Sequence, residues 1–230
     1  MSLGRAVRTA TGALNPAFWR AVIGARQAKA FDARYGTDTV RQVPVSAMRD
    51  VPPAAAAHAV HYEASAIPKL RQALAAIVRA LGDRLPAFAF VDVGSGKGLA
   101  VMQASRHPFR DVVGIEMAPA LHAIAQRNAI RFTAAHPDAA PMRFVVGDAL
   151  TVPLPDGPVV VYLYNPFDAT VLAPFAARPE HSASHGRELV VAYVNPVHRE
   201  IFDRADRYAP LWDNGRVVVY RVRPAEGAAP

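Results

Sequence analysis

One glycine-rich segment near the middle of the chain combines residue types that could hold a ligand. The apolar run Phe90–Val93, which contains Asp92, leads directly into Gly94-Ser95-Gly96-Lys97-Gly98. Glycines at such a turn allow positive φ angles and let a ligand approach bare backbone. A helix that follows the turn adds unpaired N–H groups. A carboxylate two residues before the first glycine suits a ligand with a cationic amino group.

The spacing of these glycines separates possible ligand classes. A dinucleotide-binding turn needs G-x-G-x-x-G, whereas the pattern here is G-x-G-x-G and position 99 is leucine. A phosphate loop needs four residues between its first glycine and a Gly-Lys-Ser/Thr sequence, but Lys97 is followed by Gly98 and Leu99. Neither spacing is present, so the sequence favours neither a dinucleotide nor a phosphate-loop ligand. The remaining feature is Asp92 before the turn, which suits a ligand with an amino group.

Three further segments end in polar residues after apolar runs. Val113-Gly114-Ile115-Glu116 places an acid about 20 residues past the glycines, where a carboxylate can accept hydrogen bonds from two vicinal hydroxyls. Val146-Gly147-Asp148-Ala149 places another acid, although Gly-Asp sequences also form simple turns. A fourth apolar run ends in Asn165-Pro166-Phe167.

In this order, the four segments resemble the motifs of the seven-strand class I S-adenosylmethionine-dependent methyltransferases. The resemblance covers roughly residues 60–223 and implies S-adenosyl-L-methionine as the cofactor. It implies that Glu116 holds both ribose hydroxyls and that Asp148 contacts the adenine amino group. It also implies cofactor contacts for the remaining motif residues, namely Asp92, Gly94, Ser95, Gly96, Gly98, Ala149 and Asn165.

Asn165, Pro166 and Phe167 are the predicted catalytic residues. Related enzymes with Asn/Asp-Pro-Pro-Tyr/Phe at this place bind the target N–H groups through side-chain and backbone oxygens, and the aromatic ring packs on the acceptor. This chain has one proline and then phenylalanine, so it departs from that motif. An acceptor nitrogen is favoured, and a strand end whose aromatic ring fills the core is the alternative. Methyl transfer from a sulfonium needs an oriented nucleophile and exclusion of water.

Histidines add two weaker possibilities. His198 follows a later strand and could act as a base, although a solvent-facing histidine is the commoner case. His58 with His61, and His181 with His185, have spacings that a metal could use on a helix. Neither pair has a third ligand, so we predict no metal site.

The elements that must position these residues alternate along the chain. Helices are predicted at 17–33, 68–81, 99–106, 119–135, 168–177 and 197–207, and strands at 88–93, 112–115, 142–146, 159–164, 189–194, 208–212 and 216–222. Apolar strands that alternate with helices predict a parallel sheet covered on both faces. Asp213-Asn214-Gly215 predicts a closing hairpin. The predicted fold is an α/β three-layer sandwich with a mostly parallel seven-stranded sheet that ends in an antiparallel hairpin, plus an N-terminal helical extension.

Three regions are expected along the chain. Residues 1–57 form a basic N-terminal extension with a flexible start, one helix and a connector. Residues 58–223 form the methyltransferase domain, and residues 224–230 form a disordered tail. The basic amphipathic helix of the extension is expected to pack across the domain rather than lie on a membrane surface.

The charge and composition of the chain restrict the classes of partner that it is expected to bind. The chain has a net charge of +7, and residues 1–50 hold eight basic and three acidic residues. Genome composition is the favoured explanation of its arginine usage; a nucleic-acid partner is possible but not favoured. The predicted function is N-methylation of a protein amine or small molecule. The alternatives are an RNA-modifying methyltransferase that uses the extension, and a non-catalytic cofactor-binding protein.

The chain contains no cysteine, which excludes disulfides and thiolate metal sites. No apolar stretch approaches the ~18 residues of a membrane span, and no signal peptide is recognised. A cytoplasmic location is expected.

Overall fold

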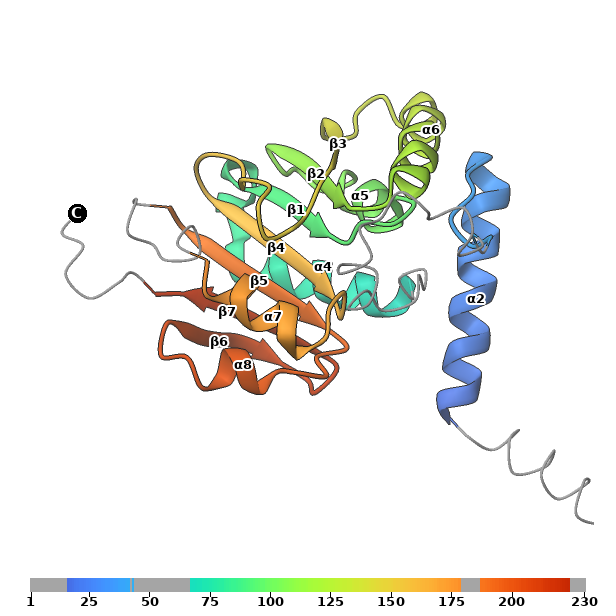
Figure 1. Cartoon of the computed structure of the whole chain (residues 1–230). Coiled ribbons are helices and arrows are strands. Elements are labelled where there is room, and N and C mark those ends of the chain that lie inside the picture. Colours follow the sequence, from blue (N-terminus) through green and yellow to red (C-terminus); the bar gives the residue numbers. More distant parts are fainter. Residues whose placement is uncertain (1–15, 42, 44–66, 179–186, 224–230) are drawn as a thin grey trace, which may run out of the picture.

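Seven strands form one mixed sheet in the computed structural model, which describes residues 16–41, 43, 67–178 and 187–223 (Figure 1). The strands are β1 (Ala89–Val93), β2 (Asp111–Glu116), β3 (Met142–Val146), β4 (Val159–Tyr164), β5 (Leu189–Val194), β6 (Tyr208–Asp213) and β7 (Val217–Val222). Their order is β3-β2-β1-β4-β5-β7-β6, and β7 runs antiparallel to both of its neighbours. The strand order reverses between β1 and β4, where open α/β sheets bind ligands.

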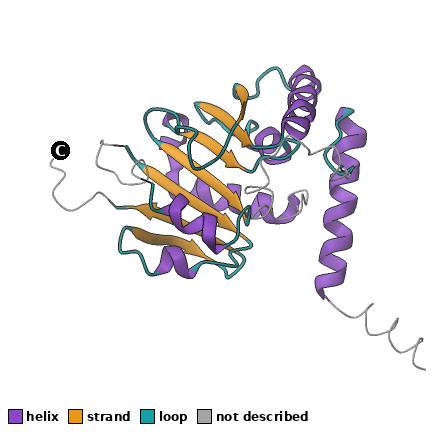
Figure 2. Cartoon of the chain, in the orientation of Figure 1, coloured by secondary structure: helices purple, strands orange, loops and turns teal. Residues whose placement is uncertain are grey.

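Helices cover both faces of this sheet and so make three layers (Figure 2). One face carries α4 (Ile67–Leu81), α5 (Leu99–Ala104) and α6 (Pro119–Ala135), and the other carries α7 (Ala169–Ala176) and α8 (Glu200–Asp203). A short 3-10 helix, η2 (Gly82–Ala87), joins α4 to β1. Every residue of β1 and β5 is buried, because alternate side chains enter the apolar clusters on the two faces. The predicted three-layer fold is confirmed.

The helix of the N-terminal extension, α2 (Pro16–Tyr35), packs against α4 and α6. Ala28 and Phe31 join a small buried cluster with residues of α4, α5 and α6. The rings of Phe31 and Phe132 stack with 5.6 Å between their centroids. The predicted packing is confirmed, although Ile23 of the same helix is exposed. In the described part of the chain, no helix has the length and apolar character needed to cross a membrane.

The helix predicted over 197–207 is wrong in length, since only the four residues of α8 are helical. The N–H groups of Ile201 and Phe202 bond to carbonyls three residues back, so tight turns precede α8. Phe202 is fully buried, with its ring 4.8 Å from that of Tyr208. Because β6 begins at Tyr208, a longer helix would move the chain away from the position at which β6 joins the sheet.

Candidate functional site

The glycine turn lies at the carboxyl end of β1, between the ends of β2 and β4. The N–H groups of Gly94 and Ser95 both donate to the carbonyl of Ile115, each at 2.9 Å. Gly94 has a φ of 74°, and a Cβ added there would lie 3.1 Å from the Cβ of Pro166. The turn therefore touches the Asn165-Pro166 segment, so the fold brings the first and fourth sequence motifs together.

Glu116 links the end of β2 to the glycine turn. Its Oε2 accepts a hydrogen bond from the N–H of Gly96 at 2.8 Å, and its Oε1 accepts one from the N–H of Ala118 at 2.8 Å. Burial raises the pKa of Glu116, while the backbone hydrogen bonds oppose this rise. Each carboxylate oxygen retains a further lone pair. Glu116 thus holds the turn in place and keeps acceptors for two hydroxyl groups.

Asp92 is a buried carboxylate, only 4% exposed, that makes no hydrogen bond or ion pair within the described residues. Burial, and to a lesser extent the negative charge of Glu116, raise its pKa to about 8. A nearby cation would stabilise the ionised form of this carboxyl group. S-adenosylmethionine carries a cationic amino group and a sulfonium, so the residues present fit this cofactor.

Ser95 and Gly98 occupy different parts of the same turn. A Cβ at Gly114 would lie 2.7 Å from the Oγ of Ser95, so the hydroxyl lies against the backbone of β2. That hydroxyl is buried and has no hydrogen-bond partner within the described residues. Gly98 has a φ of 83° and precedes the first turn of α5. Cofactor contacts by these two residues stay predictions.

Asp148 and Ala149 follow β3, beside the end of β2. The N–H of Gly147 donates to the carbonyl of Glu116 at 3.1 Å, which joins the two strand ends. The Oδ1 of Asp148 accepts a hydrogen bond from the N–H of Leu150 at 2.8 Å, so this side chain stabilises its own turn. Ala149 is buried, and its carbonyl accepts a hydrogen bond from Arg178. Their predicted adenine contacts are untested.

Asn165 is held in a left-handed backbone conformation, with a φ of 42°, where β4 ends. Its Oδ1 accepts a hydrogen bond from the hydroxyl of Tyr193 at 3.0 Å. That hydroxyl in turn accepts the N–H of His198 at 3.3 Å. Because the Tyr193 oxygen accepts the N–H of His198, its own proton is available to Asn165. This hydrogen bond fixes the orientation of the Asn165 amide, with Oδ1 directed at Tyr193.

We call the carboxyl ends of β4 and β5 the rim, and the other side chains there also have contacts. The ring of Phe167 packs 6.0 Å from that of Phe175, in the core cluster under α7. Lys69 lies 5.5 Å above the ring of Tyr164, and its Nζ is 3.4 Å from the Oδ1 of Asn195. Asn195 repeats the left-handed conformation of Asn165, with a φ of 52°.

The histidines predicted as weaker candidates divide into two groups. The Nδ1 of His198 lies 3.7 Å from the Oε1 of Glu200, close enough for an ion pair when the ring is protonated. His58, His61, His181 and His185 lie outside the described residues.

Lys97 has a structural role in the site that its sequence context did not predict. Its side chain is fully buried, and its Nζ donates to the Oδ1 of Asp38 at 3.0 Å and to the carbonyl of Arg41. The Nδ2 of Asn128 donates to the carbonyls of Lys97 and Asp38 at 3.0 and 3.1 Å. We call Asp38, Lys97 and Asn128 the extension clamp. A lysine between glycines was the only local signal, and nothing in the sequence connected it to Asp38.

Comparisons with known proteins agree with this site. Residues 91–167 match the family model described as "Methyltransferase domain". A proposed RNA methyltransferase from Pyrococcus horikoshii has the same fold, with a TM-score of 0.54 at 13% identity over 86% of this chain and 97% of that chain. No curated protein matches the sequence.

Two other solved structures align less closely. An RNA methyltransferase from Salinibacter ruber, in complex with S-adenosyl-L-homocysteine, has a TM-score of 0.45 and 24% identity over 69% of this chain and 92% of that chain. The magnesium protoporphyrin IX methyltransferase from Synechocystis, with bound S-adenosylmethionine, has a TM-score of 0.45 and 13% identity over 68% of this chain and 80% of that chain.

The matched region runs from β1 to Phe167 and so contains the glycine turn, Glu116 and the Asn165-Pro166-Phe167 segment. The chain therefore contains a methyltransferase domain, and its seven-stranded sheet with a closing hairpin is the fold of the class I S-adenosylmethionine-dependent methyltransferases.

Proposed function

We propose that this enzyme transfers a methyl group directly to a nitrogen atom, and that Asn165, Pro166 and Phe167 form its acceptor site. The observation that carries the proposal is the contact between the glycine turn and Pro166, where a Cβ at Gly94 would lie 3.1 Å from the proline. A cofactor on the turn would then lie beside the end of β4. In-line transfer requires this closeness of donor and acceptor sites.

The cofactor supplies a methyl group on a positively charged sulfur. Asp92 and the glycine turn would hold its amino-acid part, because the buried carboxylate gains from a cationic partner. Glu116 would hold the ribose, and Asp148 with Ala149 the adenine. None of these residues needs to form a covalent bond or to bind a metal.

An acceptor nitrogen is supported by the polar atoms at the end of β4. With Tyr193 donating to it, the Oδ1 of Asn165 keeps a second lone pair that can accept an N–H of the acceptor. The positive charge of Lys69, above the ring of Tyr164, lies at the same rim. A nearby cation lowers the pKa of an amine, which keeps the nitrogen lone pair available for the methyl group.

The test uses methyl-labelled S-adenosylmethionine, purified enzyme and fractionated lysate. Label is expected in a protein or small-molecule fraction, and it should survive mild alkaline treatment, which hydrolyses methyl esters but not methylamines. Asn165→Ala should abolish labelling even at saturating S-adenosylmethionine, which offsets any loss of the predicted cofactor contact of Asn165. Alkali-labile label, or full labelling by Asn165→Ala, would exclude this acceptor site.

A further inference from the structure

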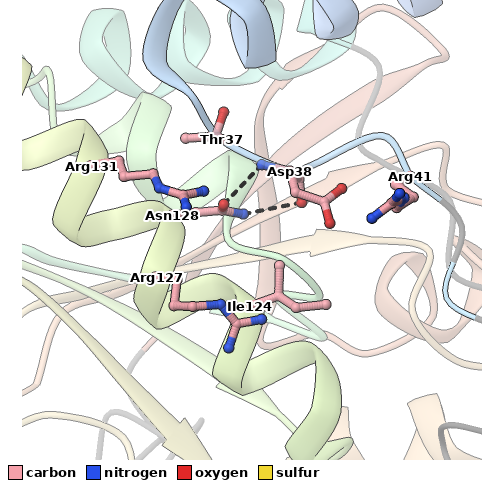
Figure 3. Close-up of a pocket in the computed structure, with 7 residues that line it drawn as sticks. All are labelled: Thr37, Asp38, Arg41, Ile124, Arg127, Asn128 and Arg131. Carbon is pink, nitrogen blue, oxygen red and sulfur yellow. Dashed lines mark hydrogen bonds between the residues drawn. The ribbon is translucent and has the colours of Figure 1, made fainter.

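A pocket of about 400 Å³ opens between α6 and the segment that follows α2 (Figure 3). The lining residues are Thr37, Asp38 and Arg41 from the extension and Ile124, Arg127, Asn128 and Arg131 from α6. The volume falls within the roughly 300–1,000 Å³ typical of small-molecule sites. None of the predicted cofactor or catalytic residues lines it, so it is separate from the reaction centre.

Three arginines border the pocket, and each has hydrogen-bond donors that no described residue uses. Within the described part of the chain, Arg41 and Arg127 make no side-chain hydrogen bond or ion pair. Arg131 donates from Nη1 to the carbonyl of Gly36 at 2.7 Å and keeps its other N–H groups. The acid among the lining residues, Asp38, is already paired with buried Lys97. The pocket therefore has a strong excess of positive charge.

Hydrogen bonds hold the backbone segments that carry these arginines. Buried Asn128 accepts the N–H of Asp38 at 2.9 Å and donates to its carbonyl, which fastens the extension segment to α6. One turn earlier, the carboxylate of Asp32 accepts hydrogen bonds from Thr37 and from the N–H of Thr39. Arg41 and Arg127 thus lie on two segments that several hydrogen bonds join.

A second arginine-lined pocket shows how the first differs. It lies at the opposite ends of the strands and includes Arg110 and Asp111. Arg110 there donates to the carbonyls of Ala87 and Asp156 and lies 3.5 Å from the Asp111 carboxylate. The guanidinium group of Arg110 is thus occupied by the protein itself, and two acids, Asp111 and Asp156, offset the charges of Arg110 and the second lining arginine, Arg143.

We propose that the pocket lined by Arg41, Arg127 and Arg131 binds a phosphate group, carried by a small phosphorylated molecule or by an RNA nucleotide. Guanidinium groups donate paired N–H groups that match phosphate oxygens, and several of them offset a doubly charged anion. The volume leaves room for the group that bears the phosphate. Because the carbonyl of Arg41 accepts from Lys97, the bound phosphate would lie next to the segment that holds the cofactor turn.

Calorimetric titrations of the full chain test this site, with S-adenosylhomocysteine present at saturation. The probes are inorganic pyrophosphate, ribose 5-phosphate and a ten-nucleotide single-stranded RNA. Ribose 5-phosphate replaces a nucleotide here because an adenosine group could enter the cofactor site. At least one probe should bind the wild type, and Arg41→Gln/Arg127→Gln should weaken that binding about tenfold or more.

The matched control is Arg79→Gln/Arg106→Gln, which removes the same charge from exposed arginines elsewhere. It should retain near-wild-type affinity. Tight ribose 5-phosphate binding identifies a small ligand, whereas RNA binding that falls steeply with salt, without ribose 5-phosphate binding, identifies nucleic acid. Absence of binding by all three probes, or equal losses in the two double variants, would overturn the proposal. No methyl transfer is measured, so a failure of the proposed N-methylation would not affect this result.

Discussion

The Nζ of Lys97 lies 3.0 Å from the Oδ1 of Asp38, although the two residues are 59 positions apart and Lys97 stands inside the glycine turn. The same ammonium donates to the carbonyl of Arg41. The N-terminal extension is therefore part of the scaffold of the cofactor turn. The segment after α2 contacts this turn through Asp38 and the carbonyl of Arg41.

Asp38→Asn should destabilise the enzyme by about 1–3 kcal/mol, because it leaves the buried ammonium of Lys97 without its ion pair. The double variant Asp38→Asn/Lys97→Met should lose less stability than the two single changes added together. Urea unfolding measures both effects. Asp206→Asn, at an exposed carboxylate, is the control and should be neutral. Additive losses would mean that the pair contributes no coupling.

Cofactor affinity should rise with pH up to about 8. Burial and the negative charge of Glu116 raise the pKa of Asp92 from 3.8 to about 8. The contribution of Asp92 to the free energy of unfolding is therefore fully present below about pH 4 and is lost as the pH rises towards 8. A cationic cofactor favours the ionised carboxylate and should release a proton on binding at pH 7. Calorimetry in two buffers of different ionisation enthalpy measures the proton number.

Asp92→Asn is the matched variant for this titration, since it keeps the shape and removes the ionisation. It should bind with no proton release near neutral pH and with a flatter pH dependence. Proton release unchanged in Asp92→Asn would assign the titration to another group.

Tyr193→Phe should lower kcat about tenfold and leave S-adenosylhomocysteine affinity unchanged. It removes the hydroxyl that joins the N–H of His198 to the Oδ1 of Asn165, so the Asn165 amide loses its fixed orientation. Tyr220→Phe is the control, because that hydroxyl bonds to Asp203 at 2.7 Å away from the rim. Equal activity losses in both variants would indicate a general effect on the core.

Gly94→Ala should weaken cofactor binding and destabilise the protein more than Gly82→Ala. Both glycines have positive φ, which costs another residue about 1–2 kcal/mol. A Cβ at Gly94 would also press against Pro166 at 3.1 Å, whereas nothing lies within 4 Å of one at Gly82. The difference between the two variants in thermal unfolding and cofactor titration isolates the contact. Indistinguishable variants would show that Pro166 moves aside freely.

The fold could be predicted because its signals are local. Apolar runs such as Val159–Tyr164 and Leu189–Val194 mark buried strands, and Asp213-Asn214-Gly215 marks the closing turn. Parallel strands place their carboxyl ends at one edge, so the motifs that follow β1, β2 and β4 had to meet. The length of α8 could not be predicted, because it depends on where Phe202 and β6 pack.

The parts of the site that escaped prediction depend on contacts between distant residues. No periodicity connects Asp38 with Lys97, and a lysine between glycines resembles a solvated residue until the segment after α2 is placed against it. Tyr193 has the apolar pattern of its strand, so its hydroxyl bond to Asn165 becomes visible only when β4 and β5 are paired.

Calorimetric titration of the purified enzyme with S-adenosylmethionine and S-adenosylhomocysteine tests the central claim most directly, because the proposed site of Asp92, the glycine turn and Glu116 would bind both. Glu116→Ala should weaken both affinities about 100-fold or more, since two hydrogen bonds to a charged group are lost. Asp138→Ala, at an exposed carboxylate, should bind like the wild type. Absence of binding of either compound by the wild type, or full binding by Glu116→Ala, would contradict this assignment of the cofactor site.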